Sequence, residues 1–85
     1  MRTLIYEPDA AQARVQAALM GGDGVQVDVA RSLVQARLML LNAAYDRLVL
    51  RRGNGAARAL LAAARASNPD CVLIDLRSMR ARPVS

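Results

Sequence analysis

Apolar and polar positions follow two alternating rhythms along the chain. Short strand-like runs occupy residues 3–6, 25–29 and 47–50, and an uninterrupted apolar run occupies residues 71–74. Over 25–29 apolar and polar residues alternate strictly, which is typical of a half-exposed strand at a sheet edge. The run at 71–74 is typical of a strand that is buried on both faces. The pattern therefore predicts four strands.

Three segments with helical spacing separate these runs, at residues 10–20, 31–44 and 56–66. Asp9 and Ser32 stand where polar side chains cap helix N-termini. The side chains expected to face the core are Ala11, Val15, Ala18 and Leu19 in the first helix, Leu33, Ala36, Leu40, Leu41 and Ala44 in the second, and Ala57, Leu60, Leu61 and Ala64 in the third. Strands that alternate with helices predict an α/β fold, a parallel sheet with helices on both faces and right-handed crossovers.

The size of the chain allows one domain with a thin core. Of its 85 residues 54% are hydrophobic, but only two are aromatic, so the core must be aliphatic and rich in alanine. A chain this short buries little more than about 60% of its unfolded surface. Dimerisation or docking to a partner would therefore bury useful additional surface. We predict an α/β domain over residues 1–76 and a basic, poorly ordered tail over residues 77–85.

The second predicted helix carries more apolar surface than one sheet face requires. Val34, Leu38 and Met39 widen its apolar side beyond the residues expected to face the sheet. A protein interface on this helix would explain the excess, and so would deeper packing of the helix within the domain.

Charge is distributed unevenly, and all 12 basic residues are arginine. Residues 1–46 carry four arginines and five acids, a net charge of −1, whereas residues 47–85 carry eight arginines and two acids, a net charge of +6. This asymmetry favours an acidic partner, nucleic acid or a bound anion, with a solvated basic face as the alternative. The candidate nucleic-acid contacts are Arg47, Arg52, Arg58, Arg65, Arg77, Arg80 and Arg82. The near absence of aromatic side chains weighs against nucleic acid, because bases stack on such residues.

The composition also limits the chemistry. The chain has no histidine, no lysine and one cysteine, Cys71, which begins an apolar run and is interpreted as a buried small hydrophobe. We therefore expect no metal, no cofactor and no catalytic nucleophile–base pair. No apolar run approaches the roughly 20 residues of a membrane span, and no signal peptide is evident at the N-terminus. The cytoplasm is the expected location.

Several motifs resemble the receiver domains of bacterial response regulators. The segment 1–9 (MRTLIYEPD) is similar to the first strand of a receiver, which ends in two or three acids. Residues 27–30 with Ala36 are similar to the second strand and helix, and residues 44–50 (AYDRLVL) are similar to the third strand. The resemblance covers residues 2–76 and implies a flavodoxin-like sheet of strand order 2-1-3-4 with three helices.

The residues that serve phosphorylation in that family are altered here. The resemblance implies a phosphoacceptor aspartate after the third strand, where this chain has Arg51, and Pro8 replaces one of the acids, leaving Glu7 and Asp9. The family's lysine has no counterpart, and a fifth parallel strand with its flanking helices does not fit in the remaining length. A second register stays open, in which residues 69–77 are the third strand and Asp75 is the phosphoacceptor.

The altered pocket, Glu7, Pro8, Asp9 and Arg51, has two interpretations. Arg51 can form an internal ion pair with the two acids in place of a metal ion. Alternatively Arg51, Arg52, Gly53, Asn54 and Gly55 form an anion site, because the glycine-containing loop leads into a helix N-terminus beyond the carboxyl ends of parallel strands.

The shortened sheet predicts an open edge at the fourth strand. An apolar edge strand exposes unpaired backbone groups that proteins normally cover. We therefore expect a second copy or a partner protein to dock on Cys71, Val72, Leu73, Ile74 and Leu76, unless the chain is part of a longer regulator. The sequence-based hypothesis is a non-catalytic, phosphorylation-independent regulatory interaction module in bacterial signalling or transcription control, with an arginine-rich nucleic-acid- or anion-binding protein as the alternative.

Overall fold

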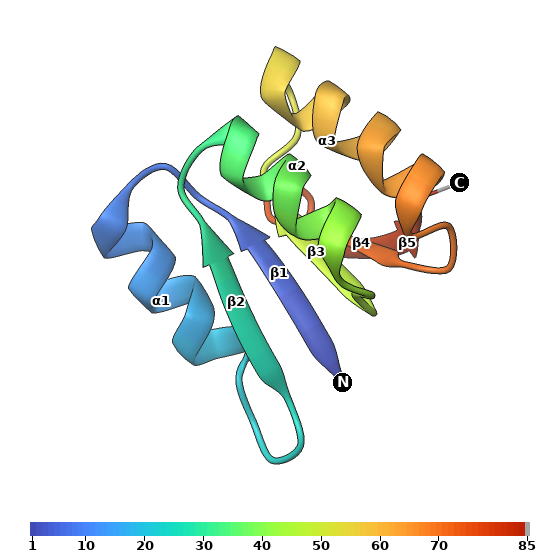
Figure 1. Cartoon of the computed structure of the whole chain (residues 1–85). Coiled ribbons are helices and arrows are strands. Elements are labelled where there is room, and N and C mark those ends of the chain that lie inside the picture. Colours follow the sequence, from blue (N-terminus) through green and yellow to red (C-terminus); the bar gives the residue numbers. More distant parts are fainter. Residues whose placement is uncertain (85) are drawn as a thin grey trace.

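Five strands and three helices alternate along residues 1–84, the part of the chain that the computed structural model describes (Figure 1). The elements, in chain order, are β1 (Arg2–Tyr6), α1 (Ala10–Met20), β2 (Gln26–Ala30), α2 (Leu33–Asn42), β3 (Arg47–Leu50), α3 (Gly55–Ser67), β4 (Val72–Asp75) and β5 (Arg80–Pro83). The first seven agree with the predicted elements to within two residues at each end. The predicted capping side chains are confirmed: Asp9 accepts a hydrogen bond from the Gln12 amide, and Ser32 accepts one from the Gln35 amide.

The sheet has the order β2-β1-β3-β4-β5. The first four strands are parallel and follow the predicted order, whereas β5 runs antiparallel to β4, so the sheet is mixed. The prediction of a four-stranded sheet followed by a poorly ordered tail over 77–85 is therefore wrong. A turn after Asp75 reverses the chain, with Met79 at a φ of 56°, and brings residues 80–83 alongside β4. Residue 85 lies outside the described residues.

This fifth strand also corrects the predicted open edge. Because β5 pairs with β4, the backbone of β4 is not free to receive another chain. Cys71 and Leu73 are buried, and Val72, Ile74 and Leu76 are half-buried. The outer edge is now β5, which carries two arginines and Pro83, and charge and proline are features that discourage edge-to-edge pairing.

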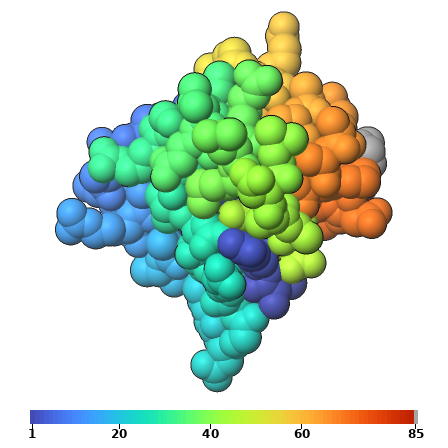
Figure 2. Space-filling view, in the orientation of Figure 1, coloured from blue at the N-terminus to red at the C-terminus, as the bar shows by residue number. Residues whose placement is uncertain are grey.

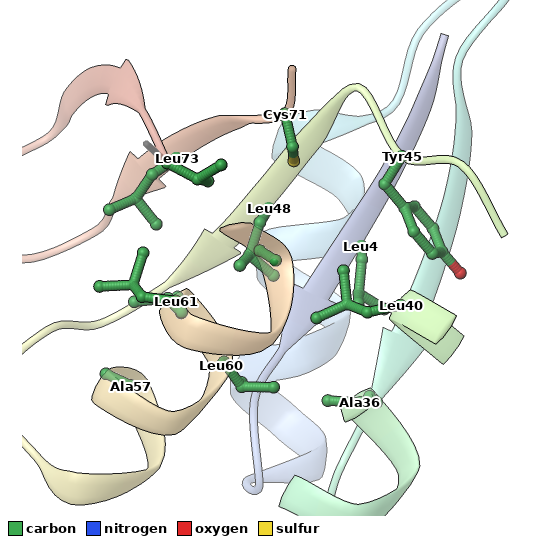
Figure 3. Close-up of a cluster of buried hydrophobic side chains, with 14 residues drawn as sticks. Leu4, Ala36, Leu40, Tyr45, Leu48, Ala57, Leu60, Leu61, Cys71 and Leu73 are labelled. Atoms are coloured by element: carbon green, nitrogen blue, oxygen red, sulfur yellow. The ribbon is translucent and has the colours of Figure 1, made fainter. Parts of the chain in front are cut away.

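The main core lies on the face of the sheet that α2 and α3 cover (Figure 3). Leu4, Leu48 and Leu73 come from three neighbouring strands and meet Leu40 of α2 and Leu60 of α3. The four residues predicted to face inward from the third helix are all buried. α1 packs against β1 and β2 on the opposite face, where Arg47 of β3 donates hydrogen bonds to the Thr3 hydroxyl (2.9 Å) and to the Met20 carbonyl at the end of α1 (3.0 Å).

The inward face predicted for the first helix is wrong. Val15 and Leu19 are 55% and 72% exposed, and Ala11 and Ala18 are exposed as well. The buried residues of α1 are Ala13 and Gln16. A small alanine lets the helix approach the sheet closely, and the Gln16 amide is held by a 2.7 Å hydrogen bond to the Glu7 carboxylate. This hydrogen bond orients α1, although the Gln16 Oε1 atom is buried without a partner among the described residues, and the more hydrophobic stripe of the helix faces solvent.

In the second helix the prediction is correct for part of the face. Ala36 and Leu40 are buried and Leu33 is half-buried, but Leu41 is 69% exposed. Ala44 is exposed because α2 ends at Asn42, so residue 44 lies in the loop that follows.

Candidate functional site

The residues of the altered pocket are held by hydrogen bonds within the loops themselves. The Glu7 carboxylate accepts from the Gln16 amide group (2.7 Å) and from the Asp9 backbone N–H (3.1 Å). The Asp9 carboxylate caps α1, and the Pro8 carbonyl accepts from the Arg31 guanidinium (3.2 Å). These contacts tie the loop after β1 to α1 and to the loop after β2.

Arg51 does not join this group. It is exposed, and the single salt bridge found between residues 1 and 84 joins Arg2 to Asp28 at 3.0 Å. The predicted ion pair of Arg51 with Glu7 and Asp9 is therefore wrong, because donors from the chain itself already hold both acids. Over the same residues no three cysteine, aspartate or glutamate side chains converge on a point that could hold a metal ion.

Asp75 ends the fourth strand, not the third. Because β3 is Arg47–Leu50 and lies beside β1, the register that places Asp75 after the third strand is wrong, and Arg51 follows that strand. Asp75 is 4% exposed, and its carboxylate accepts from the Arg77 amide (3.0 Å), the Arg52 amide (3.3 Å) and the Ser78 hydroxyl (3.2 Å). Burial opposes its ionisation, but these hydrogen bonds outweigh burial and lower the pKa of Asp75. Asp75 thus fixes the loops after β3 and β4 side by side.

Four of the five predicted anion-site residues come together beside α3. Asn54 caps the helix by accepting from the Ala57 amide (2.8 Å). Gly53 has a φ of +110°, a backbone conformation that favours glycine, and the flexible end of the Arg77 side chain lies against it. An open groove of about 560 Å³ follows, lined by Arg52, Gly53, Asn54, Gly55, Ala57, Arg58, Leu61 and Arg65. Arg51 does not line it.

The structure adds two arginines to this groove that the sequence analysis did not assign to it. Arg58 and Arg65 lie seven residues apart on α3, about two turns, and so on one side of the helix. Their spacing after the Gly53–Asn54–Gly55 loop could have identified them, since residues at i and i+7 share a helix face. Arg65 also reaches the end of β5, because its Nε donates to the Val84 carbonyl.

The predicted interface residues of α2 have different environments. Val34 and Leu38 are 69% and 54% exposed, whereas Met39 is half-buried and packs against the core. Leu41, which was expected to face inward, is instead exposed beside them. α2 therefore has an apolar outer stripe, which we define as Val34, Leu38 and Leu41.

A polar cluster beside α2 was not anticipated. The Tyr45 hydroxyl donates to Asp28 (2.7 Å), Arg2 donates to the same carboxylate oxygen (3.0 Å), and the Arg2 guanidinium lies 5.1 Å from the centre of the Tyr45 ring. Burial opposes ionisation of Asp28, but the hydrogen bonds from Tyr45 and Arg2 lower its pKa, while burial and Asp28 raise the pKa of Tyr45 to about 12. These residues are far apart in the sequence and meet because β1 pairs with β2 on one side and with β3, which follows Tyr45, on the other, so no local signal identifies them.

Cys71 is the buried small hydrophobe that the sequence predicted. It is 1% exposed and has no disulfide partner. Burial, with a smaller contribution from Asp46, raises the pKa of its thiol to about 11.

No helix within residues 1–84 is long and apolar enough to cross a membrane. Comparisons of the chain with protein-family models, with curated proteins and with solved structures found no match.

Proposed function

We propose that this protein is a non-catalytic interaction module that pairs through the outer stripe of α2, most simply with a second copy of itself. The observation that carries the proposal is the position of Val34, Leu38 and Leu41, three large aliphatic side chains that are each more than half exposed. The outer surface of α2 faces the viewer in Figure 2 with no other element in front of it.

The spacing of the stripe suits another helix. Residues at i, i+4 and i+7 fall within an arc of about 60° on a helix, and this 4–3 spacing is the apolar seam of paired helices. The stripe lies opposite Ala36 and Leu40, which α2 buries against the domain. A helix that is apolar on two opposite sides is normally covered on both. In the single chain only one side is covered.

The energy available from this stripe is modest and suits a reversible contact. Complete burial of a valine or leucine side chain contributes about 1.5–3 kcal/mol. Covering three that are half to two-thirds exposed on each of two copies would contribute roughly 6–12 kcal/mol, against an association cost of about 4–15 kcal/mol. We therefore expect a weak dimer, and a two-fold axis would bring the same stripe of both copies together.

The altered pocket supports binding over phosphoryl transfer. Arg51 stands where the receiver resemblance implies the phosphoacceptor, and a guanidinium cannot accept a phosphoryl group as that carboxylate does. Glu7 and Asp9 are engaged by Gln16 and by α1. We accordingly extend the proposal to a phosphorylation-independent, flavodoxin-like regulatory module that works in the cytoplasm, in bacterial signalling or transcription control.

Sedimentation equilibrium over a concentration series tests the proposal. The test variant Leu38→Gln/Leu41→Gln removes two residues of the stripe, and the control variant Val15→Gln/Leu19→Gln removes two equally exposed residues from α1. We expect the wild type and the control to gain mass with concentration and the test variant to remain monomeric. Equal association of both variants, or a wild type that stays monomeric at millimolar concentration, would refute pairing through α2.

A further inference from the structure

We propose that the groove along α3 binds the phosphodiester backbone of a nucleic acid without reading its bases. The inference concerns a surface other than the α2 stripe and does not depend on pairing. It starts from three guanidinium groups, those of Arg52, Arg58 and Arg65, that line one groove whose lining contains no acidic residue.

Most hydrogen-bond donors of these arginines are free. Within residues 1–84 the side chains of Arg52 and Arg58 make no hydrogen bond or salt bridge, and Arg65 uses only its Nε, on the Val84 carbonyl. A guanidinium presents several N–H groups in a planar fork that matches phosphate oxygens. The groove therefore offers several unused donors toward an anion.

The basic surface continues beyond the groove onto the β4–β5 hairpin. The Arg77 guanidinium lies against Gly53, one of the residues that line the groove. Arg82 is paired with Leu73 and Arg80 with Asp75, so both arginines project on the face of the sheet that α3 covers. Asp75, the acid nearest this surface, is buried and already accepts three hydrogen bonds. Asp75 lies opposite Arg80 and attracts Arg52, but this one carboxylate leaves the arginines of the groove and hairpin with a net positive charge.

The extent of this surface favours a chain of phosphates over a single one. Arg58 and Arg65 lie about 10 Å apart along the helix axis, and Arg80 and Arg82 lie about 7 Å apart along β5. The groove is open, and its only apolar lining residues are Ala57 and Leu61, so it offers neither an enclosed pocket nor an aromatic face for a base. A protein partner would need a cluster of apolar anchors. Among the described residues, Met79 in the β4–β5 turn is the one large hydrophobic side chain exposed on this surface, and the others lie on α1, on α2 and at Met1. A nucleic-acid backbone needs only the positive charge.

The test measures fluorescence anisotropy of a labelled, mixed-sequence single-stranded oligonucleotide between about 50 and 200 mM salt. The test variant Arg52→Gln/Arg58→Gln removes two groove arginines whose side chains hold no other part of the described chain. The control variant Arg14→Gln/Arg37→Gln removes the same charge from exposed positions on α1 and α2. We expect the wild-type log affinity to fall linearly with log salt, and the test variant to lose about 1.4 from the slope, since each phosphate contact contributes about 0.7. The control should keep the wild-type slope.

Four outcomes would overturn the inference. The first is no binding of the oligonucleotide at the lowest salt, and the second is an equal loss of slope in the test and control variants. The third is saturation of the protein by ATP at micromolar concentration while the oligonucleotide stays unbound. The fourth is more effective competition by polyglutamate than by unlabelled oligonucleotide. The double variant Leu38→Gln/Leu41→Gln, which tests pairing through α2, should bind the oligonucleotide as the wild-type monomer does. Failure of one proposal therefore does not affect the other.

Discussion

Asn68 holds α2 in place against α3, and its removal gives a well-defined prediction. Its side chain is 6% exposed and makes hydrogen bonds with the end of α2 and with the loop that connects α2 to β3. The Oδ1 atom accepts from the Tyr45 amide (2.7 Å), and the Nδ2 group donates to the Leu40 carbonyl (2.8 Å) and the Ala43 carbonyl (3.3 Å). One side chain thus satisfies the end of the helix that carries the proposed interface.

The cost of Asn68→Ala follows from the groups it leaves unpaired. A buried donor or acceptor without a partner costs about 1–3 kcal/mol. The Tyr45 N–H would lose its partner completely, and the carbonyls at the end of α2 would lose theirs in part. We therefore expect the free energy of unfolding to fall by about 2–4 kcal/mol, which for a domain of this size lowers Tm by roughly 10–25 °C.

Urea unfolding followed by far-ultraviolet circular dichroism measures this change. The matched control is Asn42→Ala, because Asn42 is an exposed asparagine that makes one hydrogen bond, to the Leu38 carbonyl. Its loss should cost less than about 0.5 kcal/mol. All variants are compared at one low protein concentration, since self-association would add to stability. An Asn68→Ala variant as stable as Asn42→Ala would refute the role assigned to Asn68.

Three further predictions concern Asp75, the strand β5 and Cys71. Because the pKa of Asp75 is lowered in the fold, its ionised form stabilises the protein above the ordinary aspartate pKa of 3.8, and this contribution is lost as pH falls below about 4. The variant Asp75→Asn should therefore have a lower Tm than the wild type at pH 7, and its Tm should fall less steeply as the solution is acidified. Truncation after Ser78 removes β5 and the buried Val84 and should cost at least about 2 kcal/mol, whereas an unchanged Tm would mean that residues 79–85 behave as a free tail. The Cys71 thiol, with a pKa raised to about 11 by burial, should react with a disulfide reagent at pH 8 only after urea unfolds the chain, and rapid labelling of the native protein would contradict its placement in the core.

The sequence predicted those parts of the fold that have local signals. The caps Asp9 and Ser32, the alternating strand at β2 and the amphipathic α3 could each be identified within a few residues. The alternation of helices with strands also predicted that the first four strands are parallel, whereas their order was implied by the receiver resemblance alone.

The parts that depend on distant contacts were not predictable in the same way. The segment of β5 has two arginines, an exposed alanine and a proline, so no apolar alternation marks it as a strand. It is ordered because β4 offers an unpaired backbone edge and because Val84 enters the core. In α1 the burial of Gln16 in place of Val15 depends on Glu7, a partner nine residues away in the loop between β1 and α1.

The candidate sites also divide into parts that local sequence predicts and parts that depend on distant contacts. The residues from Arg52 to Gly55 line one groove, and the sequence could predict this grouping because the four residues are adjacent in the chain. The ion pair expected for Arg51 failed because hydrogen bonds from Gln16 and the Asp9 amide already hold Glu7. The outer stripe of α2 was identified only in part, since Leu41 and Leu40 are neighbours in sequence and only the packing of the helix decides which of them is buried.

The most direct test of the account is an amide chemical-shift dilution series of the full chain by heteronuclear NMR. If α2 is the pairing surface, the amide signals of Val34, Leu38 and Leu41 shift progressively with concentration, and those of Val15 and Leu19 stay constant. Shifts that are confined to α1, or spectra that do not change up to millimolar concentration, would contradict the claim that this protein works by pairing through the outer stripe of α2.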